Sequence, residues 1–379
     1  MRVILAGATA LAALGANAYA ETYAARGADI VDAAARVAVI AEDRSDIDVS
    51  VTSGSGLAAP SVRLDDGRVV IDGGLRNRIQ GCTYQFGARS VRIRDGGNVP
   101  LAQLPQITLR VPRTLDLSFG GAVFAEVSAS DGGAVAARGC GEAELGDASG
   151  DLALSLSGSG DVRAGDIGAD AALSLAGSGD LNVGDVRGGL SLELRGSGDV
   201  RAGAVGGDAA LSLTGSGDIN VGRVGGALTT ALRGSGDVRV AGVHGARADL
   251  DASGSGNVSV GAGQVAELNL RNASSGRVRF DASAGAARIE ARSSGNTSVA
   301  AVTGTRADIV LTSSGNVDVR GGQVGALSAR NSGSGNLRFD GGADAAEVEV
   351  RSSGNVIVRR AGPQRSIRDT GSGAARIGS

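Results

Sequence analysis

Five aspartates recur every 19 residues, and they are the side chains in this sequence best suited to bind a metal ion. They are Asp161, Asp180, Asp199, Asp218 and Asp237. If they stack at the spacing of β-strands, about 4.8 Å, the carboxylates repel one another unless a cation or a donor compensates them. Oxygen ligands suit Ca²⁺, so a calcium ladder is one interpretation. The other is turn chemistry, in which each carboxylate accepts backbone N–H bonds at a corner.

The later repeats favour turn chemistry over calcium. There the same position is held mostly by Asn, with Arg277 as an interruption. Amide and carboxylate oxygens cap turns alike, whereas they differ greatly as ligands of Ca²⁺. The nine-residue pattern of calcium-binding rolls is also missing. The asparagines at this position are Asn257, Asn296, Asn316, Asn336 and Asn355.

A second polar column lies two positions after the aspartates and alternates Arg with Asn. Period-two alternation places these side chains on the outer face of a strand. They either form a surface ion-pair lattice with the aspartates or make a stripe that binds an anionic polysaccharide or lipopolysaccharide. The lattice is the expectation, because exposed ion pairs of this kind are common. The candidate binding stripe consists of Arg163, Arg201 and Arg239, with Asn182 and Asn220 between them.

No residues have the pattern of a catalytic or cofactor site. The single histidine, His244, has no Ser, Cys or Asp arrangement that would make it a base, and we expect an exposed corner residue. The glycine-rich triplets lack the Gly-Lys-Ser/Thr of a phosphate loop. Polysaccharide-cleaving β-helices use clustered charges and aromatic platforms, whereas this chain has no Trp and only 3 Tyr and 5 Phe. We expect no enzyme activity and no cofactor.

The two cysteines, Cys82 and Cys140, are expected to form a disulfide. In an oxidising compartment an isolated pair is more often a bridge than a metal site, and two thiols without nearby His are too few for zinc. By the loop-entropy model the bridge would stabilise the fold by about 4 kcal/mol, less any strain.

These residues belong to a repeat that runs through most of the chain. A Gly-Ser-Gly or Ser-Ser-Gly triplet, followed mostly by Asp or Asn, returns every 19 or 20 residues. Corners need a positive φ or a close approach of neighbouring coils, and glycine allows both at low cost. The last glycines of these corner triplets are Gly160, Gly179, Gly198, Gly217, Gly236, Gly256, Gly276, Gly295, Gly315, Gly335 and Gly354, with Gly373 in the tail.

Each repeat carries two stretches of alternating apolar residues. One follows the triplet, as in Val200 and Ala202, and one precedes the next triplet, as in Leu211 and Leu213. One apolar residue between them, such as Val205, plugs a turn. Alternation predicts strands, and this density of glycine argues against helices. We therefore predict an all-β fold, a right-handed parallel β-helix or solenoid of 19–20-residue two-strand rungs.

Composition and charge limit the kinds of partner that the protein could bind. The 37 Lys and Arg residues nearly balance 40 Asp and Glu residues, which argues against nucleic acid as a binding partner. The N-terminus has the three parts of an export signal: Arg2, an apolar stretch and Ala18-Tyr19-Ala20 as a cleavage site. No later run approaches the about 20 apolar residues that span a bilayer, so we expect no transmembrane segment in the mature chain. The expected parts are a signal peptide (1–20), an N-terminal all-β capping region (21–120), the solenoid (121–360) and a C-terminal cap (361–379).

The repeated Gly-Ser-Gly-Asp-Val units, after an export signal and an N-terminal β stretch, resemble the putative auto-transporter adhesin head domain family, the GIN-type domain of bacterial envelope proteins. The predicted hairpin from Asp65 to Asp72 is similar to that family as well. The resemblance implies a β-helical fold, an adhesion role, and a periplasmic, outer-envelope or extracellular location.

We therefore expect an adhesin-like protein that presents an elongated sheet to a glycan, a matrix or a protein partner. A structural envelope rod is the alternative, followed by a β-helical polysaccharide lyase or hydrolase.

Overall fold

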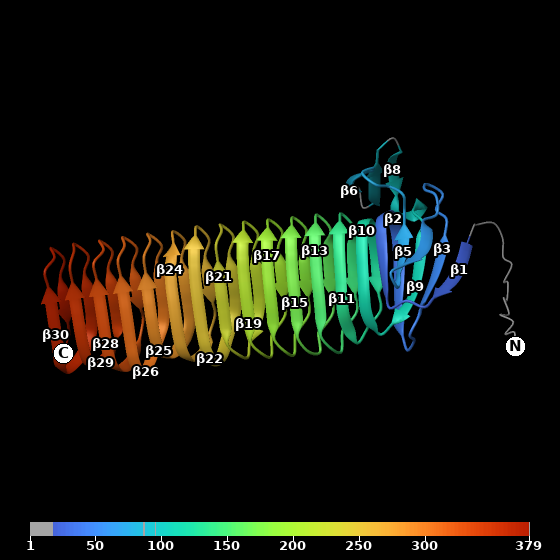
Figure 1. Ribbon diagram of the computed structural model, residues 1–379. Coiled ribbons are helices and arrows are strands. Elements are labelled where there is room, and N and C mark those ends of the chain that lie inside the picture. Colours follow the sequence, from blue (N-terminus) through green and yellow to red (C-terminus); the bar gives the residue numbers. More distant parts are fainter. Residues whose placement is uncertain (1–17, 86–87, 95, 379) are drawn as a thin grey trace.

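The computed structural model describes residues 18–85, 88–94 and 96–378, which form one long rod of stacked strands (Figure 1). The rod is a β-solenoid of about 14 turns with coils of about 19 residues. The predicted parallel solenoid is therefore confirmed, while its right-handed sense stays a prediction. Most of the predicted signal peptide lies outside the described residues, and Ala18–Ala20 at its predicted end begin the first strand.

A regular rung contains one long strand, one short strand and a plug. The long strand precedes the triplet and pairs in parallel with its equivalent 19 residues on, as Leu152 does with Ala171. The short strand follows the triplet and pairs in the same way. The predicted plugs also bridge neighbouring rungs, as Ile167 does with Val186, which the two-strand prediction did not include. We call the two sheets the long face and the short face.

In the first regular rungs the long-face and short-face segments are separate strands, and two later rungs also have a separate short-face strand. The long-face strands are β11 (Gly132–Gly139), β13 (Leu152–Gly158), β15 (Ala171–Gly177), β17 (Leu190–Gly196), β19 (Ala209–Gly215) and β21 (Leu228–Leu232). The short-face strands are β12 (Glu142–Leu145), β14 (Asp161–Ala164), β16 (Leu181–Val183), β18 (Val200–Ala202), β20 (Ile219–Val224), β23 (Val258–Val260) and β27 (Val317–Val319).

In the later rungs the plug joins the long-face segment in one strand, and often the short-face segment as well. These strands are β22 (Val238–Gly254), β24 (Gly263–Ser274), β25 (Val278–Ala291), β26 (Thr297–Leu311), β28 (Gly322–Asn331), β29 (Leu337–Val350) and β30 (Val356–Asp369). The last strand, β31 (Ala375–Ile377), pairs in parallel with β30. Residues 361–377 continue the parallel pairing of the solenoid, because β30 also pairs with β29, and the expected C-terminal cap (361–379) stays a prediction.

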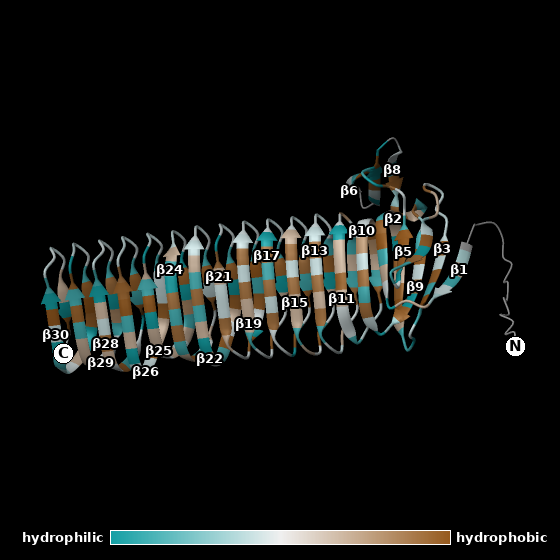
Figure 2. Cartoon of the chain, viewed as in Figure 1, coloured by the Kyte–Doolittle hydropathy of each residue, from teal (hydrophilic) through white to brown (hydrophobic). Residues whose placement is uncertain are grey.

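Aliphatic side chains fill the rod in columns along its axis, and among the described residues two aromatic rings, Phe280 and Phe339, are fully buried. Apolar and polar residues alternate along the strands in Figure 2. Such a core is thin and repeated, so Val, Leu, Ile and Ala suffice to fill it.

The corner triplets need glycine for two different reasons. In five triplets the first glycine adopts a positive φ, which side chains rarely allow: Gly158, Gly177 (+150°), Gly196, Gly215 and Gly254. The last glycine does not. Instead, a Cβ at Gly179 would lie 1.7 Å from the carbonyl oxygen of Gly160 in the preceding rung. Stacked coils therefore exclude any side chain at this position.

The N-terminal region both begins and closes the solenoid. β2 (Gly27–Glu42) pairs in parallel with β10 (Thr114–Val127), so solenoid pairing starts well before the expected boundary at residue 121. The antiparallel strands β1 (Ala18–Tyr23) and β3 (Ile47–Thr52) then cover the end of the sheet through β9 (Gln106–Pro112). Such a cover hides an edge that would otherwise pair with another chain.

The predicted hairpin is confirmed. β4 (Ser61–Asp65) pairs antiparallel with β5 (Arg68–Asp72), and β5 adds to β2 on the long face. The two turn residues, Asp66 and Gly67, both have positive φ, as this tight turn requires.

A small module projects from the rod beside β2 and β10 (Figure 1). It is a separate antiparallel sheet of β6 (Ile79–Gln85), β7 (Ala88–Ile93) and β8 (Gly97–Pro100), followed by the short helix η1 (Leu101–Gln103). It has its own apolar core around Val91. The predicted disulfide between Cys82 and Cys140 ties it to the first triplet corner. In the described part of the chain no helix is long and apolar enough to cross a membrane.

Candidate binding surface

The five repeated aspartates cap the backbone at the corner before the short face. Asp161 Oδ1 accepts the backbone N–H of Asp180 at 3.1 Å, and the next aspartates repeat this bond along the rod. Asp237 accepts the backbone N–H of Asn257 in the same way, and in the later rungs asparagine side chains accept the equivalent N–H. The expected turn chemistry is thus confirmed, because carboxylate and amide serve the same donor.

The calcium alternative finds no ready-made site in the described residues. Among them, no group of three or more His, Cys, Asp or Glu side chains is arranged to hold a metal ion. One oxygen of each aspartate in the column accepts a backbone N–H, and the second oxygen of Asp199, Asp218 and Asp237 is paired with an arginine. A melting temperature that does not change in EDTA would remove the calcium alternative.

Two further aspartate ladders were not predicted. At the corner before the plug, Asp147 accepts the N–H of Asp166, and Asp166 accepts that of Asp185. At the corner before the long face, Asp151 and Asp170 do the same. The sequence contains a signal for both ladders, because a second and a third aspartate of each early repeat also recur at 19-residue spacing. All three corners of the early rungs are therefore capped by one device.

The arginines of the predicted stripe are engaged in ion pairs. Arg201 pairs with Asp199 at 3.0 Å, and Arg239 with Asp218 at 3.1 Å and with Asp237. Arg163 pairs with Glu142, which occupies the position equivalent to Asp161 in the preceding rung. The three arginine side chains are about half exposed, so each pair contributes little stability. These are the contacts of an ion-pair lattice, and ligand binding by the stripe stays a prediction.

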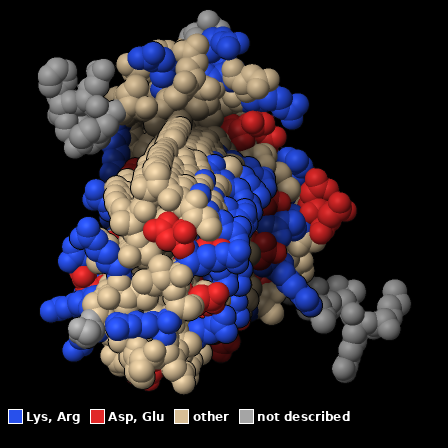
Figure 3. Space-filling view, turned by 90° about the vertical axis from the view of Figure 1, so that its left-hand side faces the viewer, with Lys and Arg blue, Asp and Glu red and all other residues tan. Residues whose placement is uncertain are grey.

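Charges of both signs are interspersed over the rod seen from its C-terminal end (Figure 3). His244 is exposed on β22, as expected.

The outer surface of the long face changes character halfway along the rod. From β11 to β21 most of its outward side chains are small: Ala134, Ala136, Ala153, Ser155, Ala172, Ser174, Ser191, Ala210, Ser212, Thr229 and Ala231. From β22 onward the equivalent positions are mostly charged or amide side chains. The boundary lies between Thr229 and its neighbour Asp249.

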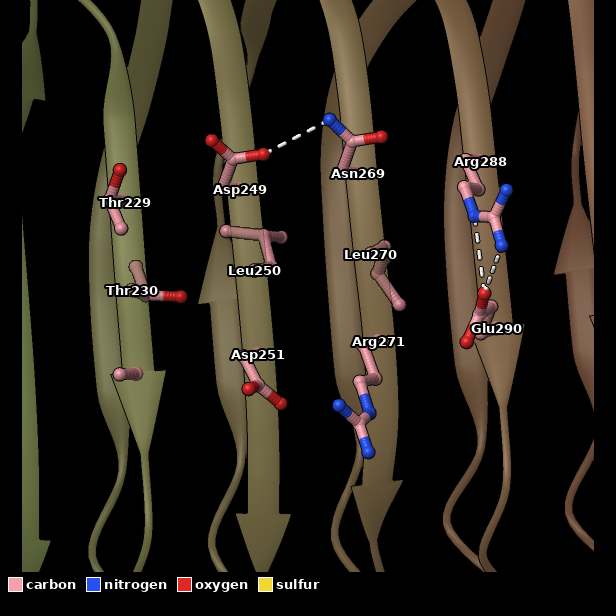
Figure 4. A pocket seen from close by; sticks show the side chains of 11 residues that line it. Thr229, Thr230, Asp249, Leu250, Asp251, Asn269, Leu270, Arg271, Arg288 and Glu290 are labelled. Carbon is pink, nitrogen blue, oxygen red and sulfur yellow. Dashed lines mark hydrogen bonds and ion pairs between the residues drawn. The ribbon is translucent and has the colours of Figure 1, made fainter.

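A groove of about 390 Å³ lies at this boundary. Figure 4 shows its side chains in rows across four strands, with Asp249 accepting a hydrogen bond from Asn269 at 3.0 Å. Hydrogen bonding from Arg288 lowers the pKa of Glu290 against the opposing effect of burial, and Arg292 adds to the lowering. Two more grooves, of about 550 and 630 Å³, lie over the small-residue half of the same face.

A known family model matches the C-terminal part of the solenoid. The model of the family described as "Putative auto-transporter adhesin, head GIN domain" matches residues 205–322 and again residues 287–378. The predicted resemblance is thereby confirmed for the C-terminal part of the solenoid. The hairpin of β4 and β5 lies outside both matches.

A search of the solved structures aligns this chain with the crystal structure of a putative adhesin from Parabacteroides distasonis ATCC 8503. The alignment covers 95% of this chain and 96% of that chain, with 12% sequence identity and a TM-score of 0.23. Nothing about function follows from a superposition at this TM-score. No curated protein matches the chain.

Proposed function

Building on the adhesin-domain match, we propose that this chain is a binding protein of the cell envelope or exterior whose long face holds a glycan, matrix or protein partner. The observation that supports the proposal most is that three grooves share this one face. Together they run from β10 to β25, over most of the rod.

The chemistry of the long face suits an extended ligand. Alanine and serine side chains let a partner approach the sheet closely, while Ser and Thr hydroxyls offer hydrogen bonds. Stacked, backbone-capped rungs hold these groups in fixed rows, so little conformational entropy is lost when a ligand binds. Beyond β21 the ion-pair rows around Glu290 offer both signs of charge.

An exported location fits the disulfide, which persists in oxidising compartments. We propose binding without catalysis. Turnover of any polysaccharide in a panel of glycans by the purified chain would contradict this part.

The test is binding to glycan and matrix-protein arrays by the purified chain and by two variants, Ala172→Arg and Ala210→Arg. Both alanines are exposed on the long face, so the variants should fold normally and weaken binding by about tenfold or more. Ser298→Arg on the short face is the matched control and should bind as the wild type does. Ordered rods in electron micrographs without any saturable ligand would favour the structural alternative.

A further inference from the structure

A second, more enclosed pocket lies where the small module meets the rod. Its floor is the short-face end of β9, β2, β10 and β12, and its wall is formed by Arg89 of β7 and Leu101 of η1. Its volume is about 310 Å³, at the lower end of the range of about 300–1,000 Å³ for small-molecule sites. This is the size class of a single sugar or amino acid, not of an extended chain.

The wall is held in place covalently and electrostatically. Cys82 of the module is bonded to Cys140, one residue before the corner glycine that leads into β12. Arg89 pairs with one oxygen of Glu142, while Arg163 of the next rung pairs with the other. The Glu142 side chain is only 11% exposed, so both of its oxygens are used within a mostly buried site. The pocket is therefore preformed.

Arg36 is the unusual residue on the floor. Its neighbours across the sheet are Gln106 on one side and Phe124 on the other, and neither accepts a hydrogen bond from it. Its Nε is buried without a partner, and among the described residues no carboxylate pairs with its guanidinium. Arg36 is partly buried and lines the pocket, and although its Nε is out of reach of a ligand, a planar anion can accept two parallel bonds from the terminal nitrogens of a guanidinium that has no carboxylate partner.

The other residues of the pocket are suited to bind a ligand that has hydroxyl groups and an apolar ring face. Glu126 is exposed and has no partner among the described residues, and Glu144 lies beside it on the neighbouring strand. Glu144 has only a distant contact, at 4.0 Å, with Arg163. Carboxylates accept hydrogen bonds, so they favour a ligand rich in O–H groups. Phe124, which is half-buried beside Arg36, presents a flat apolar surface.

We propose that this pocket binds an acidic sugar residue, a pyranose with a ring carboxylate. The carboxylate pairs with Arg36, the C–H face of the ring lies on Phe124, and hydroxyls donate to Glu126 and Glu144. This inference rests on the proposed binding function and adds a class of ligand. The pocket, however, lies on the short face, so its test can fail or succeed whatever the test of the long face shows.

The experiment is titration of the purified chain with sodium D-glucuronate, followed by ligand-observed NMR. Saturable binding is expected, and Arg36→Gln should weaken it by about 10- to 100-fold because it removes charged hydrogen bonds. Glu126→Gln, which changes an exposed residue, should weaken it by a smaller factor. Arg279→Gln on the same face, outside both the pocket and the arginine stripe, is the control and should leave the dissociation constant unchanged.

Three further measurements separate the proposal from its competitors. D-Glucose has the hydroxylated ring without the carboxylate, and acetate has the carboxylate without the ring. Both should bind far more weakly than glucuronate. Equal binding of acetate would reduce the pocket to an anion site and overturn the sugar assignment. Absence of saturation by glucuronate, or equal loss in R36Q and R279Q, would also overturn it. If R36Q melts at a lower temperature than the wild type, its weaker binding could reflect unfolding. The proposal is then tested by E126Q, which should still bind glucuronate more weakly than the wild type does.

Discussion

Cys82 of β6 is bonded to Cys140 at the first triplet corner, with 5.6 Å between their Cα atoms across a sequence separation of 58 residues. This bond is the covalent link between the projecting module and the rod. The module also shares its apolar core with Ala122 of β10. The position of the pocket wall therefore depends on a contact between distant parts of the chain.

Replacing both cysteines, as Cys82→Ser with Cys140→Ser, is expected to loosen the module while the rod persists. The loop-entropy model gives a loss of about 4 kcal/mol at most, confined to this end of the chain. Limited proteolysis should cut between Leu75 and Leu104 faster than in the wild type. Equal cutting rates would show that the apolar core alone holds the module.

Gly217→Ala is expected to destabilise the central rungs by about 3 kcal/mol or more. A Cβ at this position would lie 1.9 Å from the carbonyl oxygen of Gly198, so the two coils must separate. The midpoint of urea unfolding, followed by circular dichroism, measures the effect. Ser216→Ala, at the exposed middle residue of the same triplet, is the control and should change little.

Asp180→Ala should destabilise the rod by about 1–2 kcal/mol, because the N–H of Asp199 loses its acceptor. Asp180→Asn should be nearly neutral, since asparagine makes the same bond in the later rungs, as Asn296 does with Asn316. Urea midpoints of the two variants distinguish the cases. A large loss in the Asn variant would mean that the negative charge itself is needed.

Thr230→Val is expected to stabilise the rod by about 1 kcal/mol. Thr230 occupies an interior column between Leu211 and Leu250, and its buried Oγ1 has no hydrogen-bond partner. Valine keeps the shape and removes the unsatisfied oxygen. Thr229→Val, one residue earlier and exposed, is the matched control. A lower melting temperature for Thr230→Val would show that the hydroxyl has a role in the core.

Asp318→Asn should stabilise the protein at neutral pH, by about 1 kcal/mol or less. Burial raises the pKa of Asp318, and Asp340 raises it further against the effect of Arg338 and Arg320. Because the folded-state pKa lies above the unfolded value, the folded state loses stability as the pH rises from the unfolded pKa through the folded pKa. The gain should vanish below pH 3.8, where the carboxyl is protonated in both states. Urea midpoints measured across this range would contradict it if the gain persisted in acid.

The repeat made most of the fold predictable from the sequence. Stacking places equivalent residues of consecutive rungs side by side, so a constant interval and period-two alternation specify the strands, corners and buried columns at once. The same logic predicted that Asp161 and its successors would cap corners, since Asn replaces Asp in later rungs. It missed the ladders that begin at Asp147 and Asp151, although they repeat at the same spacing.

Only the tertiary structure decided how the first hundred residues meet the rod. Parallel pairing of β2 with β10 joins residues that are more than eighty positions apart, as in Arg36 and Phe124, and no period marks such a contact. The same holds for the module and for the pocket around Arg36. Local patterns specify what each residue does within its own rung, whereas a non-repeating pocket depends on which distant segments pack together. The sequence alone therefore determined the solenoid and its capped corners, and the packing of its N-terminal end determined the pocket.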